Sequence, residues 1–451
     1  MSNTQEKYWF GKAPSHWNAV RVKSLFRLAC ESSKDNHGME LLSVYTDIGV
    51  KPRKELEQKG NKASTTDGYW IVRKGDLVVN KLLAWMGAVG YSEYDGVTSP
   101  AYDILRARTP SINPKFYHYL FRLKLTQGEF RRWSKGIMDM RLRLYFSELG
   151  NVFIPCPPLS EQNAIVEFID NETARIDQLI EKKKQLINLL NEKRNSLVYE
   201  KVNTINQNVL RFSRKKFPSK FITDNFPQTK ELPFDVIRLG LVTRIFSGGT
   251  PDKSNLSFWL NGHIPWIGSG EVNQFKVTKP TAYITSAAVA NSSTKLMPKG
   301  SIIMALAGQG KTKAMVAQMG IDAYGNQSLA CIDGYNGNNR FLLWWLKSLY
   351  LQIRALSSQE TRDGLNQSIL GQLPAPILNK QIQISIADFL DKENEKIDQL
   401  IRQVSASIEL LRLFKSSLIT EAVTGQLDIK AWEKRGRTDE RLDNIQEAMR
   451  T

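Results

Sequence analysis

The chain has 451 residues, too many for one ordinary hydrophobic core, so we expect two or three domains. Hydrophobic residues make up 41% of the chain and aromatic residues 10%, a composition that excludes an intrinsically disordered protein. The formal net charge of +17 favours a polyanionic partner, either nucleic acid or an anionic membrane surface, although a merely basic soluble protein has the same composition.

The cysteines and the lack of long apolar runs narrow the choice of partner. Cys30, Cys156 and Cys331 are far apart and odd in number, so they predict neither a disulfide framework nor a zinc cluster, and they favour a reducing cytoplasm. No run of about 18 apolar residues occurs, so no membrane span is predicted. Nucleic acid is therefore the favoured partner, and no membrane is expected.

Residues 1–155 are predicted to form a mixed α/β domain. The alternating pattern of residues 20–26 is typical of a strand, and residues 75–80 form a short apolar run after a turn signal, which indicates a buried strand. Asp95-Gly96 is a pair typical of a tight β-hairpin. Residues 115–133 have the apolar periodicity of one helix.

A first long helix is predicted over residues 156–202, with Ser160 as its N-cap and Glu161 favourable in its first turn. Apolar residues recur there at alternating steps of four and three over several heptads, which indicates a coiled-coil seam. About 40 residues with a rise of 1.5 Å each make this helix roughly 60 Å long. The predicted pairing residues are Ile165, Ile169, Ile176, Leu179, Leu186, Leu190 and Leu197.

The segment that opens this helix occurs twice in the chain. Residues 149–180 recur as residues 370–401 at a constant offset of 221, and no gap is needed. A second long helix is therefore predicted over residues 377–425. Its pairing residues are Ile386, Leu390, Ile397, Leu400, Val404, Leu411, Phe414 and Leu418. Glu172 and Glu393 occupy matching positions, where they either fix the register of the helices or lie at an exposed end of the seam.

Residues 233–376 are predicted to form a second domain similar to the first. Matched residues, such as Val20 with Ile237 and Lys74 with Lys299, have offsets that vary between 217 and 225. The globular halves therefore differ by insertions and substitutions, whereas the helices keep a fixed offset.

Two further segments complete the chain. Residues 203–232 are a predicted connector, rich in Asn, Lys and Ser, and residues 426–451 are a charged tail that we expect to be loose. The predicted fold class is α+β: two similar α/β domains separated by two long antiparallel coiled-coil helices, with a pseudo-twofold internal repeat.

Catalytic motifs are weak. Residues 308–312 have the composition of a phosphate-binding loop, but such a loop needs a glycine where Ala305 stands. Glu57 and Lys59 form half of a nuclease metal site, with no acidic partner at a convincing distance. The histidines lack metal-ligand spacing, and no cofactor fingerprint is present. We predict no catalytic residue and no metal; a nuclease or DNA methyltransferase with a divergent active site is the alternative.

Basic and aromatic residues in loops are the stronger signal. Arg and Lys neutralise phosphates, whereas Arg, Asn and Gln read base edges. Each of these residues alone is more often solvated surface or core, but charge, loop placement and duplication agree for the set. The predicted DNA-binding residues are Lys81, Trp85, Arg131, Arg132, Lys135, Arg141 and Arg143 in the first domain, and Trp266, Gln309, Lys311, Lys313, Asn326 and Gln327 in the second.

Several short motifs then point to one family. They include Ala84-Trp85-Met86-Gly87, Ser247-Gly248-Gly249-Thr250-Pro251, Ile264-Pro265-Trp266-Ile267 and the helix-entry segment Pro157-Pro158-Leu159-Ser160-Glu161-Gln162. In combination they resemble the specificity subunit of type I restriction-modification systems over nearly the whole chain. One departure is Asn379-Lys380-Gln381, where the family usually has a Leu-x-Glu-Gln helix start.

The resemblance implies a DNA-binding subunit without catalytic activity. Each α/β domain would be a target recognition domain that reads one half of a bipartite site in double-stranded DNA. The helices would space the halves and dock two methyltransferase subunits, and restriction subunits would join the complex. S-adenosylmethionine, ATP and magnesium would be bound by those partners, and no cofactor is expected in this chain.

Overall fold

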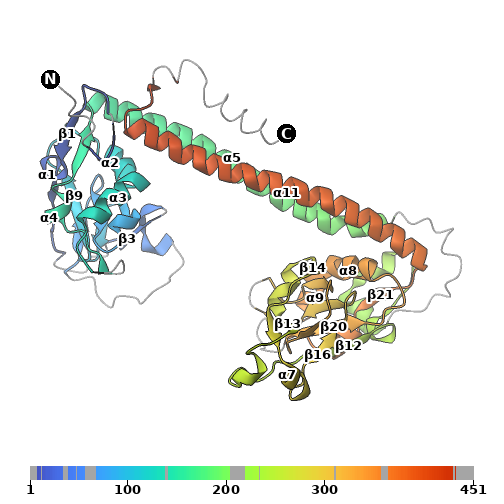
Figure 1. Cartoon of the computed structure of the whole chain (residues 1–451). Coiled ribbons are helices and arrows are strands. Elements are labelled where there is room, and N and C mark those ends of the chain that lie inside the picture. The colour runs from blue at the N-terminus through green and yellow to red at the C-terminus, as the bar shows by residue number, and fades with distance from the viewer. Residues whose placement is uncertain are drawn as a thin grey trace. The chain divides into compact units, whose positions relative to one another are not determined.

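The computed structural model describes residues 8–11, 13–33, 39–46, 48–55, 68–137, 141–203, 219–232, 234–308, 311–356, 364–429 and 432 (Figure 1). The chain forms two compact units. Residues 1–184 and 403–451 belong to the first unit, and residues 185–402 form the second.

The first unit contains a four-stranded antiparallel sheet with the strand order β2-β9-β6-β7. These strands are β2 (Phe26–Leu28), β9 (Tyr102–Ala107), β6 (Leu77–Asn80) and β7 (Val89–Tyr91). All four residues of β6 are buried, which confirms the predicted buried strand. Three antiparallel pairs complete the strands: β1 (Asn18–Arg21) with β10 (Phe153–Cys156), β3 (Leu42–Tyr45) with β4 (Gly49–Pro52), and β5 (Trp70–Val72) with β8 (Gly96–Thr98).

Residues 20–26 are not the single strand that we predicted. β1 ends at Arg21, a helical turn, α1 (Val22–Leu25), follows, and β2 begins at Phe26. The turn is needed because β1 pairs with β10 whereas β2 pairs with β9. The backbone N–H of Val22 donates to the carbonyl of Val152 at 3.0 Å as the chain changes partner.

The predicted hairpin at Asp95-Gly96 is also wrong. The strands on its two sides belong to different sheets, because β7 pairs with β6 and β8 pairs with β5. Asp95 instead accepts a hydrogen bond from the backbone N–H of Lys74 at 2.8 Å, so the Asp-Gly pair stabilises a neighbouring turn.

Residues 115–133 form two helices, α2 (Pro114–Phe121) and α3 (Lys124–Trp133), where we predicted one. The break follows from the tertiary role of Arg122, which donates to the carbonyls of Thr46 at 2.7 Å and Val89 at 3.0 Å. The remaining helix of this globular part is α4 (Phe146–Leu149).

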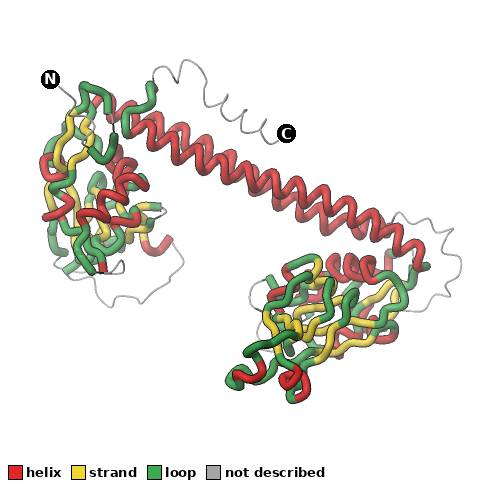
Figure 2. Tube along the Cα trace, in the orientation of Figure 1, coloured by secondary structure: helices red, strands yellow, loops and turns green. Residues whose placement is uncertain are grey.

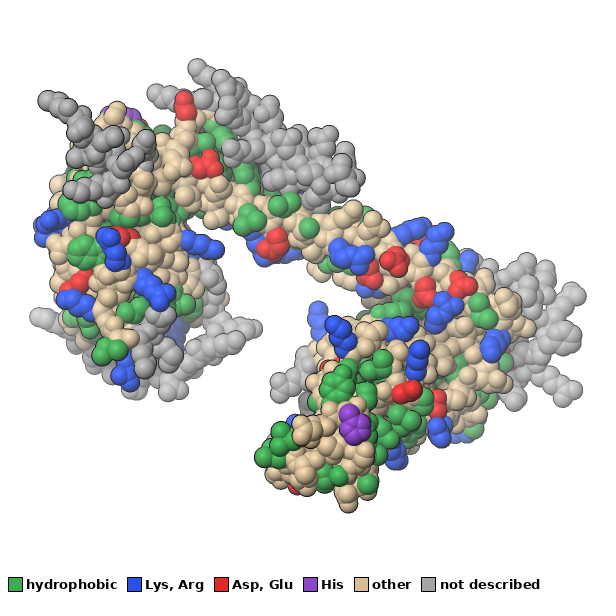
Figure 3. Space-filling view, viewed as in Figure 1, with side chains coloured by type: hydrophobic (Ala, Val, Ile, Leu, Met, Phe, Trp, Pro, Cys, Tyr) green, Lys and Arg blue, Asp and Glu red, His purple; other side chains and the backbone are tan. Residues whose placement is uncertain are grey.

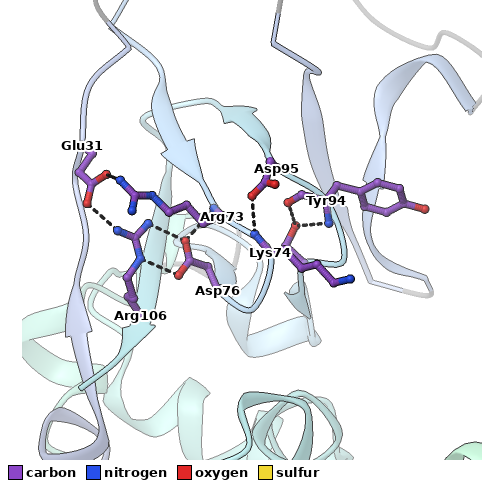
Figure 4. Close-up of polar contacts among 8 residues, drawn as sticks. Glu31, Arg73, Lys74, Asp76, Tyr94, Asp95 and Arg106 are labelled. Carbon is purple, nitrogen blue, oxygen red and sulfur yellow. Dashed lines mark hydrogen bonds and ion pairs between the residues drawn. The ribbon is translucent and has the colours of Figure 1, made fainter. Parts of the chain in front are cut away.

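A buried ion pair joins β9 to the turn before β6. Arg106 donates from Nε and Nη2 to the two carboxylate oxygens of Asp76, each at 2.8 Å, and from Nη1 to Glu31 at 2.5 Å (Figure 4). The hydrogen bonds that Arg106 donates to Asp76 raise the pKa of Arg106. At the positions that match Asp76 and Arg106 in strand register, the second unit has Ser301 and Asp333. Asp333 accepts instead from Arg244 of the neighbouring strand at 2.8 Å.

The second unit repeats the strand order of the first. Its five-stranded sheet runs β12-β20-β17-β18-β14, and the first four strands match β2-β9-β6-β7. They are β12 (Arg244–Ser247), β20 (Leu329–Asp333), β17 (Ile302–Ala305), β18 (Val316–Met319) and β14 (Lys276–Val277). A four-stranded sheet contains β15 (Ala282–Ile284), β13 (Ile264–Ile267), β19 (Ala323–Gly325) and β16 (Lys295–Met297). β11 (Val236–Arg238) pairs with β21 (Pro374–Pro376), and the shorter helices are α6 (Lys220–Asn225), α7 (Ser286–Ala290), α8 (Asn339–Ser348), α9 (Tyr350–Ala355) and α10 (Gln367–Gly371).

The long helices are α5 (Leu159–Asn203) and α11 (Lys380–Val423), drawn as the longest red segments in Figure 2. The backbone N–H groups of Glu161 and Gln162 donate to the carbonyl of Pro158, so α5 begins before Ser160, and the prediction of Ser160 as its N-cap is wrong. The start of α11 is capped by Asn379, whose Oδ1 accepts from the N–H of Gln381 at 2.8 Å.

Within each unit the segments of α5 and α11 pair antiparallel through one ion pair. In the first unit Lys415 Nζ contacts both carboxylate oxygens of Asp177, at 2.6 and 2.7 Å. In the second unit Arg194 pairs with Asp398. Because 398 − 177 and 415 − 194 both equal 221, these are one contact repeated, which confirms the antiparallel helices and the pseudo-twofold repeat.

The helix seam differs from the predicted one in its middle. Ile165, Ile169, Ile176, Leu197, Ile386, Leu390, Ile397, Leu411, Phe414 and Leu418 are buried, and Leu179, Leu190 and Val404 are half-buried. Leu186 and Leu400 are exposed, at 44% and 46%, so their predicted pairing is wrong, and Ile180 and Ile408 are buried instead. A helix with 3.6 residues per turn drifts away from a strict seven-residue pattern, which moves the buried stripe by one position.

Glu172 and Glu393 do not fix the register of the two helices, because neither bonds to the partner helix among the described residues. Glu393 accepts from Lys396 on its own helix at 2.7 Å, and Glu172 Oε2 is buried with no hydrogen-bond partner among the described residues. The ion pairs of Asp177 and Asp398 join the two helices instead.

A buried glutamine attaches each long helix to the globular part of its own unit. Gln162 Oε1 accepts from the backbone N–H of Asn113, the N-cap residue of α2, at 2.8 Å. Gln383 Oε1 accepts in the same way from Asn338, the N-cap residue of α8, at 2.8 Å. The same joint therefore forms in both units.

An aspartate about two turns further along each helix adds polar contacts to this joint. Asp170 accepts from Lys115 Nζ at 2.7 Å and from the hydroxyl of Tyr119. The matching contacts in the second unit are Arg340 Nη1 at 2.6 Å and Trp344 Nε1 at 2.7 Å, both donated to Asp391.

The predicted connector and tail both contain packed residues. Ile222 and Phe226, in the last part of residues 203–232, are buried in the core of the second unit. Trp432, in the predicted loose tail, is buried in the first unit with its ring centroid 5.9 Å from that of Phe168. Described parts of both segments therefore belong to the folded units.

We predict that Asp76→Ser alone lowers the free energy of unfolding by about 3 kcal/mol, because it leaves the guanidinium of Arg106 partly buried beside only one carboxylate. The double variant Asp76→Ser with Arg106→Met removes both charges of the pair and should recover much of that loss. Chemical denaturation measures both, and a double variant that is less stable than the single one would contradict this explanation.

Candidate nucleic-acid interface

The first unit presents a basic loop after α3. The backbone groups of Lys135 and Arg143 exchange two hydrogen bonds of 2.9 Å, which close the loop at its base. Gly136 has a φ of 150°, and a Cβ atom there would lie 2.5 Å from the carbonyl oxygen of Arg141, so only glycine fits. The next residue, Ile137, is 99% exposed.

The loop that follows β6 lies against this region. The backbone N–H of Leu144 donates to the carbonyl of Lys81 at 2.9 Å, and the guanidinium of Arg131 lies 5.4 Å from the ring centroid of Trp85. That distance is typical of a cation–π contact. The structure therefore brings together Lys81, Trp85, Arg131 and Arg143, which are far apart in the sequence.

The cations of this group differ in availability. Arg132 pairs with Glu129 at 2.8 Å and Lys135 with Glu148 at 2.5 Å; both cationic side chains are exposed, whereas both carboxylates are largely buried. The exposed N–H groups of the two cations can still donate to a phosphate. With Arg131, Arg141 and Arg143 included, residues 129–148 contain five cations and three carboxylates (Glu129, Asp139 and Glu148), so the segment has a formal net charge of two positive.

The ammonium group of Lys81 already has partners within its own unit. Its Nζ donates to the carbonyl of Pro100 at 2.7 Å and lies 3.5 Å from the carboxylate of Asp103. Burial raises the pKa of Asp103, and Lys81 lowers it in opposition. Lys81 therefore positions its loop more than it offers charge to a ligand.

In the second unit, a glycine-rich loop supports Asn326 and Gln327. A Cβ atom on Gly248 would lie 1.9 Å from the carbonyl oxygen of Gly325, so the two loops can approach only with glycine there. The hydroxyl of Thr250 donates to Gln327 Oε1, and Gln327 is exposed. Amide side chains held in this way can read base edges.

Trp266 belongs to the core, which corrects the expectation of a direct DNA contact. It is only 7% exposed, its ring packs at 5.3 Å against Trp259, and its N–H donates to the carbonyl of Gly249 at 3.3 Å. Its role is to support the glycine-rich loop.

Lys311 and Lys313 are held by α9. Tyr350 donates its hydroxyl to the carbonyl of Lys311 at 2.7 Å, and Arg354 donates to the carbonyl of Lys313 at 3.3 Å. The side chain of Lys311 is exposed. Gln309 lies outside the described residues.

Sequence reasoning missed the exposed apolar residues beside these cations. Ile137 and the nearby Leu82, Leu83 and Met86 are exposed on the first unit. The available signal was an apolar residue inside a polar loop. Figure 3 shows Lys and Arg side chains on the surfaces of both globular parts.

In the described part of the chain, no three His, Cys, Asp or Glu side chains gather closely enough to hold a metal ion. His118 is half-buried, desolvation lowers its pKa to about 3, and its Nδ1 accepts from the N–H of Tyr91 at 3.1 Å, so it has a structural role. Glu57 and Lys59 lie outside the described residues. No described helix is long and apolar enough to cross a membrane.

Known proteins share this sequence pattern and this fold. The model of the type I restriction modification DNA specificity domain matches residues 14–189 and 231–410. Over 88 residues the chain is 38% identical to the EcoR124I/EcoR124II specificity subunit of Escherichia coli, a match that covers 20% of this chain and 22% of that protein.

Two solved structures have the same fold along most of the chain. A chain from a type I restriction-modification system, studied for complex assembly and conformational transition, has a TM-score of 0.62 at 15% identity and covers 92% of this chain and 100% of its own. The HsdS subunit from Thermoanaerobacter tengcongensis has a TM-score of 0.50 at 16% identity, with coverages of 94% and 100%. With both halves matched, the chain belongs to the family of type I restriction-modification DNA specificity proteins.

Proposed function

We propose that this chain is the DNA-binding specificity subunit of a type I restriction-modification enzyme, in which each unit reads one half of a bipartite site in double-stranded DNA. The duplication carries the proposal: one strand order and one glutamine joint occur in both units, while the loops that would meet DNA differ. Two similar readers with different loops suit a site with two different halves.

The long helices would set the distance between the half-sites. α5 has 45 residues, which corresponds to roughly 68 Å at 1.5 Å per residue. Half-sites on one face of a duplex lie about 34 Å apart per turn, so helices of this length are sufficient for such a spacer.

Exposed leucines on the helices support the docking of two methyltransferase subunits. Leu189 is 60% exposed and Leu410 is 39% exposed, and they are related by the offset of 221. A single exposed leucine is common on protein surfaces, but its repetition at equivalent positions would suit two equivalent protein partners.

In this proposal the chain positions DNA and performs no chemistry. S-adenosylmethionine, ATP and magnesium would be bound by the methyltransferase subunits and by restriction subunits that join the complex in the cytoplasm. No observation favours the alternative of a nuclease or methyltransferase with a divergent site.

The half-site proposal is tested by transplanting residues 219–376 into a homologous subunit. The chimera should transfer one half-site only, as read from the methylated adenines in the DNA of cells that carry the complex. A matched transplant from residue 233 omits the buried Ile222 and Phe226 and should be less stable. A folded 219–376 chimera that changes both half-sites, or neither, would contradict the proposal.

The basic loop is tested with Arg132→Ala, Lys135→Ala and Arg141→Ala combined. The assembled complex should bind duplex DNA more weakly, and the slope of log K against log salt should fall by about one for each lost phosphate contact. Lys124→Ala, an exposed lysine of α3, is the matched control and should leave the slope unchanged. An unchanged slope in the triple variant would exclude this loop from the interface.

The docking proposal predicts that Leu189→Asp and Leu410→Asp each remove one methyltransferase subunit, because a carboxylate replaces a leucine that a partner would bury. Mass photometry should show a complex with one methyltransferase subunit for each single variant and none for the double variant. Leu125→Asp, at an exposed leucine on α3, is the control and should keep both subunits. A double variant that still binds two methyltransferase subunits would show that Leu189 and Leu410 do not dock them.

A further inference from the structure

The second unit contains a cationic pocket that the proposed reading of DNA bases does not use. Its volume is about 320 Å³, and it lies between the end of α5 and residues of β18, α8 and α9. Its polar lining residues are Asn191, Arg194, Asn195, Lys311, Lys347 and Tyr350, and residues 314–316 form an apolar wall.

Two of the three cations have unsatisfied donors. Arg194 pairs with Asp398, but its Nε is buried with no hydrogen-bond partner among the described residues. Lys347 lies 5.2 Å from the ring centroid of Phe275 and has no carboxylate within ion-pair distance in the described part of the chain. Buried donors without partners are costly, so a ligand with acceptor oxygens would be stabilised here.

The charge of the pocket suits a dianion. Arg194, Lys311 and Lys347 contribute three positive charges and Asp398 contributes one negative charge, which leaves two positive charges. A phosphate group carries close to two negative charges near neutral pH and offers several strong acceptor oxygens. A carboxylate would neutralise only one of the two charges.

The volume and the remaining lining leave room for more than the phosphate. A volume of about 320 Å³ lies at the lower end of the range for small-molecule sites, roughly 300–1,000 Å³. Tyr350 and the apolar wall offer surface to an organic group, and Asn191 and Asn195 offer amide hydrogen bonds.

We propose that this pocket binds a phosphate group, carried either by a small phosphorylated molecule or by the DNA backbone. The proposal goes beyond base reading, because the binding of a free phosphate compound requires no DNA.

The protonation of Lys347 should respond to the ligand. Burial, together with the nearby charge of Arg194, lowers the pKa of Lys347 to about 8, and Asp398 opposes this shift. An anion stabilises the charged ammonium, so its arrival should raise the pKa of Lys347. Near pH 8 binding should therefore take up protons.

The test is a calorimetric titration of the full chain with pyrophosphate and with a nucleoside monophosphate. Lys347→Met, which keeps the apolar stem beside Phe275, should weaken binding by about tenfold or more, as expected for the loss of a hydrogen bond to a charged group. Lys311→Met should weaken it less, and Lys279→Met, at an exposed lysine of the same unit, should not change it. Titrations at pH 8 in two buffers of different ionisation enthalpy should show proton uptake that Lys347→Met abolishes.

The source of the phosphate follows from a second measurement, in the assembled complex. If the DNA backbone supplies it, Lys347→Met should lower the salt slope of DNA binding by about one, and pyrophosphate should compete with DNA. If a free molecule supplies it, pyrophosphate should bind and leave the DNA affinity unchanged.

Absence of binding of either probe together with an unchanged salt slope would overturn the proposal, as would equal binding by wild type, Lys311→Met and Lys347→Met. If Lys347→Met does not fold, the exposed Lys311→Met still decides the outcome. Because the titration contains no DNA, its failure is distinguishable from a failure of the proposed DNA recognition.

Discussion

The attachment of each long helix to its globular part depends on one buried amide. The first turn of α2 and of α8 begins at an asparagine whose backbone N–H would otherwise be buried without an acceptor, and Gln162 or Gln383 supplies that acceptor from the long helix. An unsatisfied buried N–H is costly, so the helix and the globular part must meet at this point. Because this joint must form in both units, the helix residues that make it keep a constant sequence offset of 221. The sheet residues are not tied to the joint in this way, and their offsets vary.

The interior of the sheets shows how much variation the joint permits. Asp76 and Arg106 form an ion pair in the first unit, whereas the second unit has Ser301 and Asp333 at the matching strand positions, and Asp333 pairs with Arg244. Two different arrangements of side-chain charges therefore occur with the same strand order. Core chemistry and strand topology are separable here, because the pairing of backbone groups fixes the order of the strands.

The repeat, the two long helices and the buried strand β6 were predictable because periodicity and internal similarity are local properties of the sequence. The hairpin at Asp95-Gly96 and the single helix over residues 115–133 were predicted wrongly because partners distant in the sequence decide them: Lys74 uses the Asp95 carboxylate, and Arg122 leaves the helix to reach other loops. The candidate DNA-binding residues were also hard to predict, because contacts with distant residues decide which of them lie at the surface. Trp85 and Trp266 look alike in the sequence, yet one lies beside Arg131 at the surface and the other supports Gly249 from the core.

The division of the chain between the two units has a consequence for synthesis on the ribosome. The second unit is one continuous stretch, residues 185–402, whereas the first needs residues 1–184 together with residues 403–451. Contacts such as those of Trp432 with Phe168 and of Gly425 with Pro14 join positions that are hundreds of residues apart. Non-local closure of this kind is slow, so the middle of the chain can finish folding while the N-terminal unit waits for the last residues to emerge. A nascent chain that stops early therefore leaves its first-made domain incomplete and its second-made domain whole.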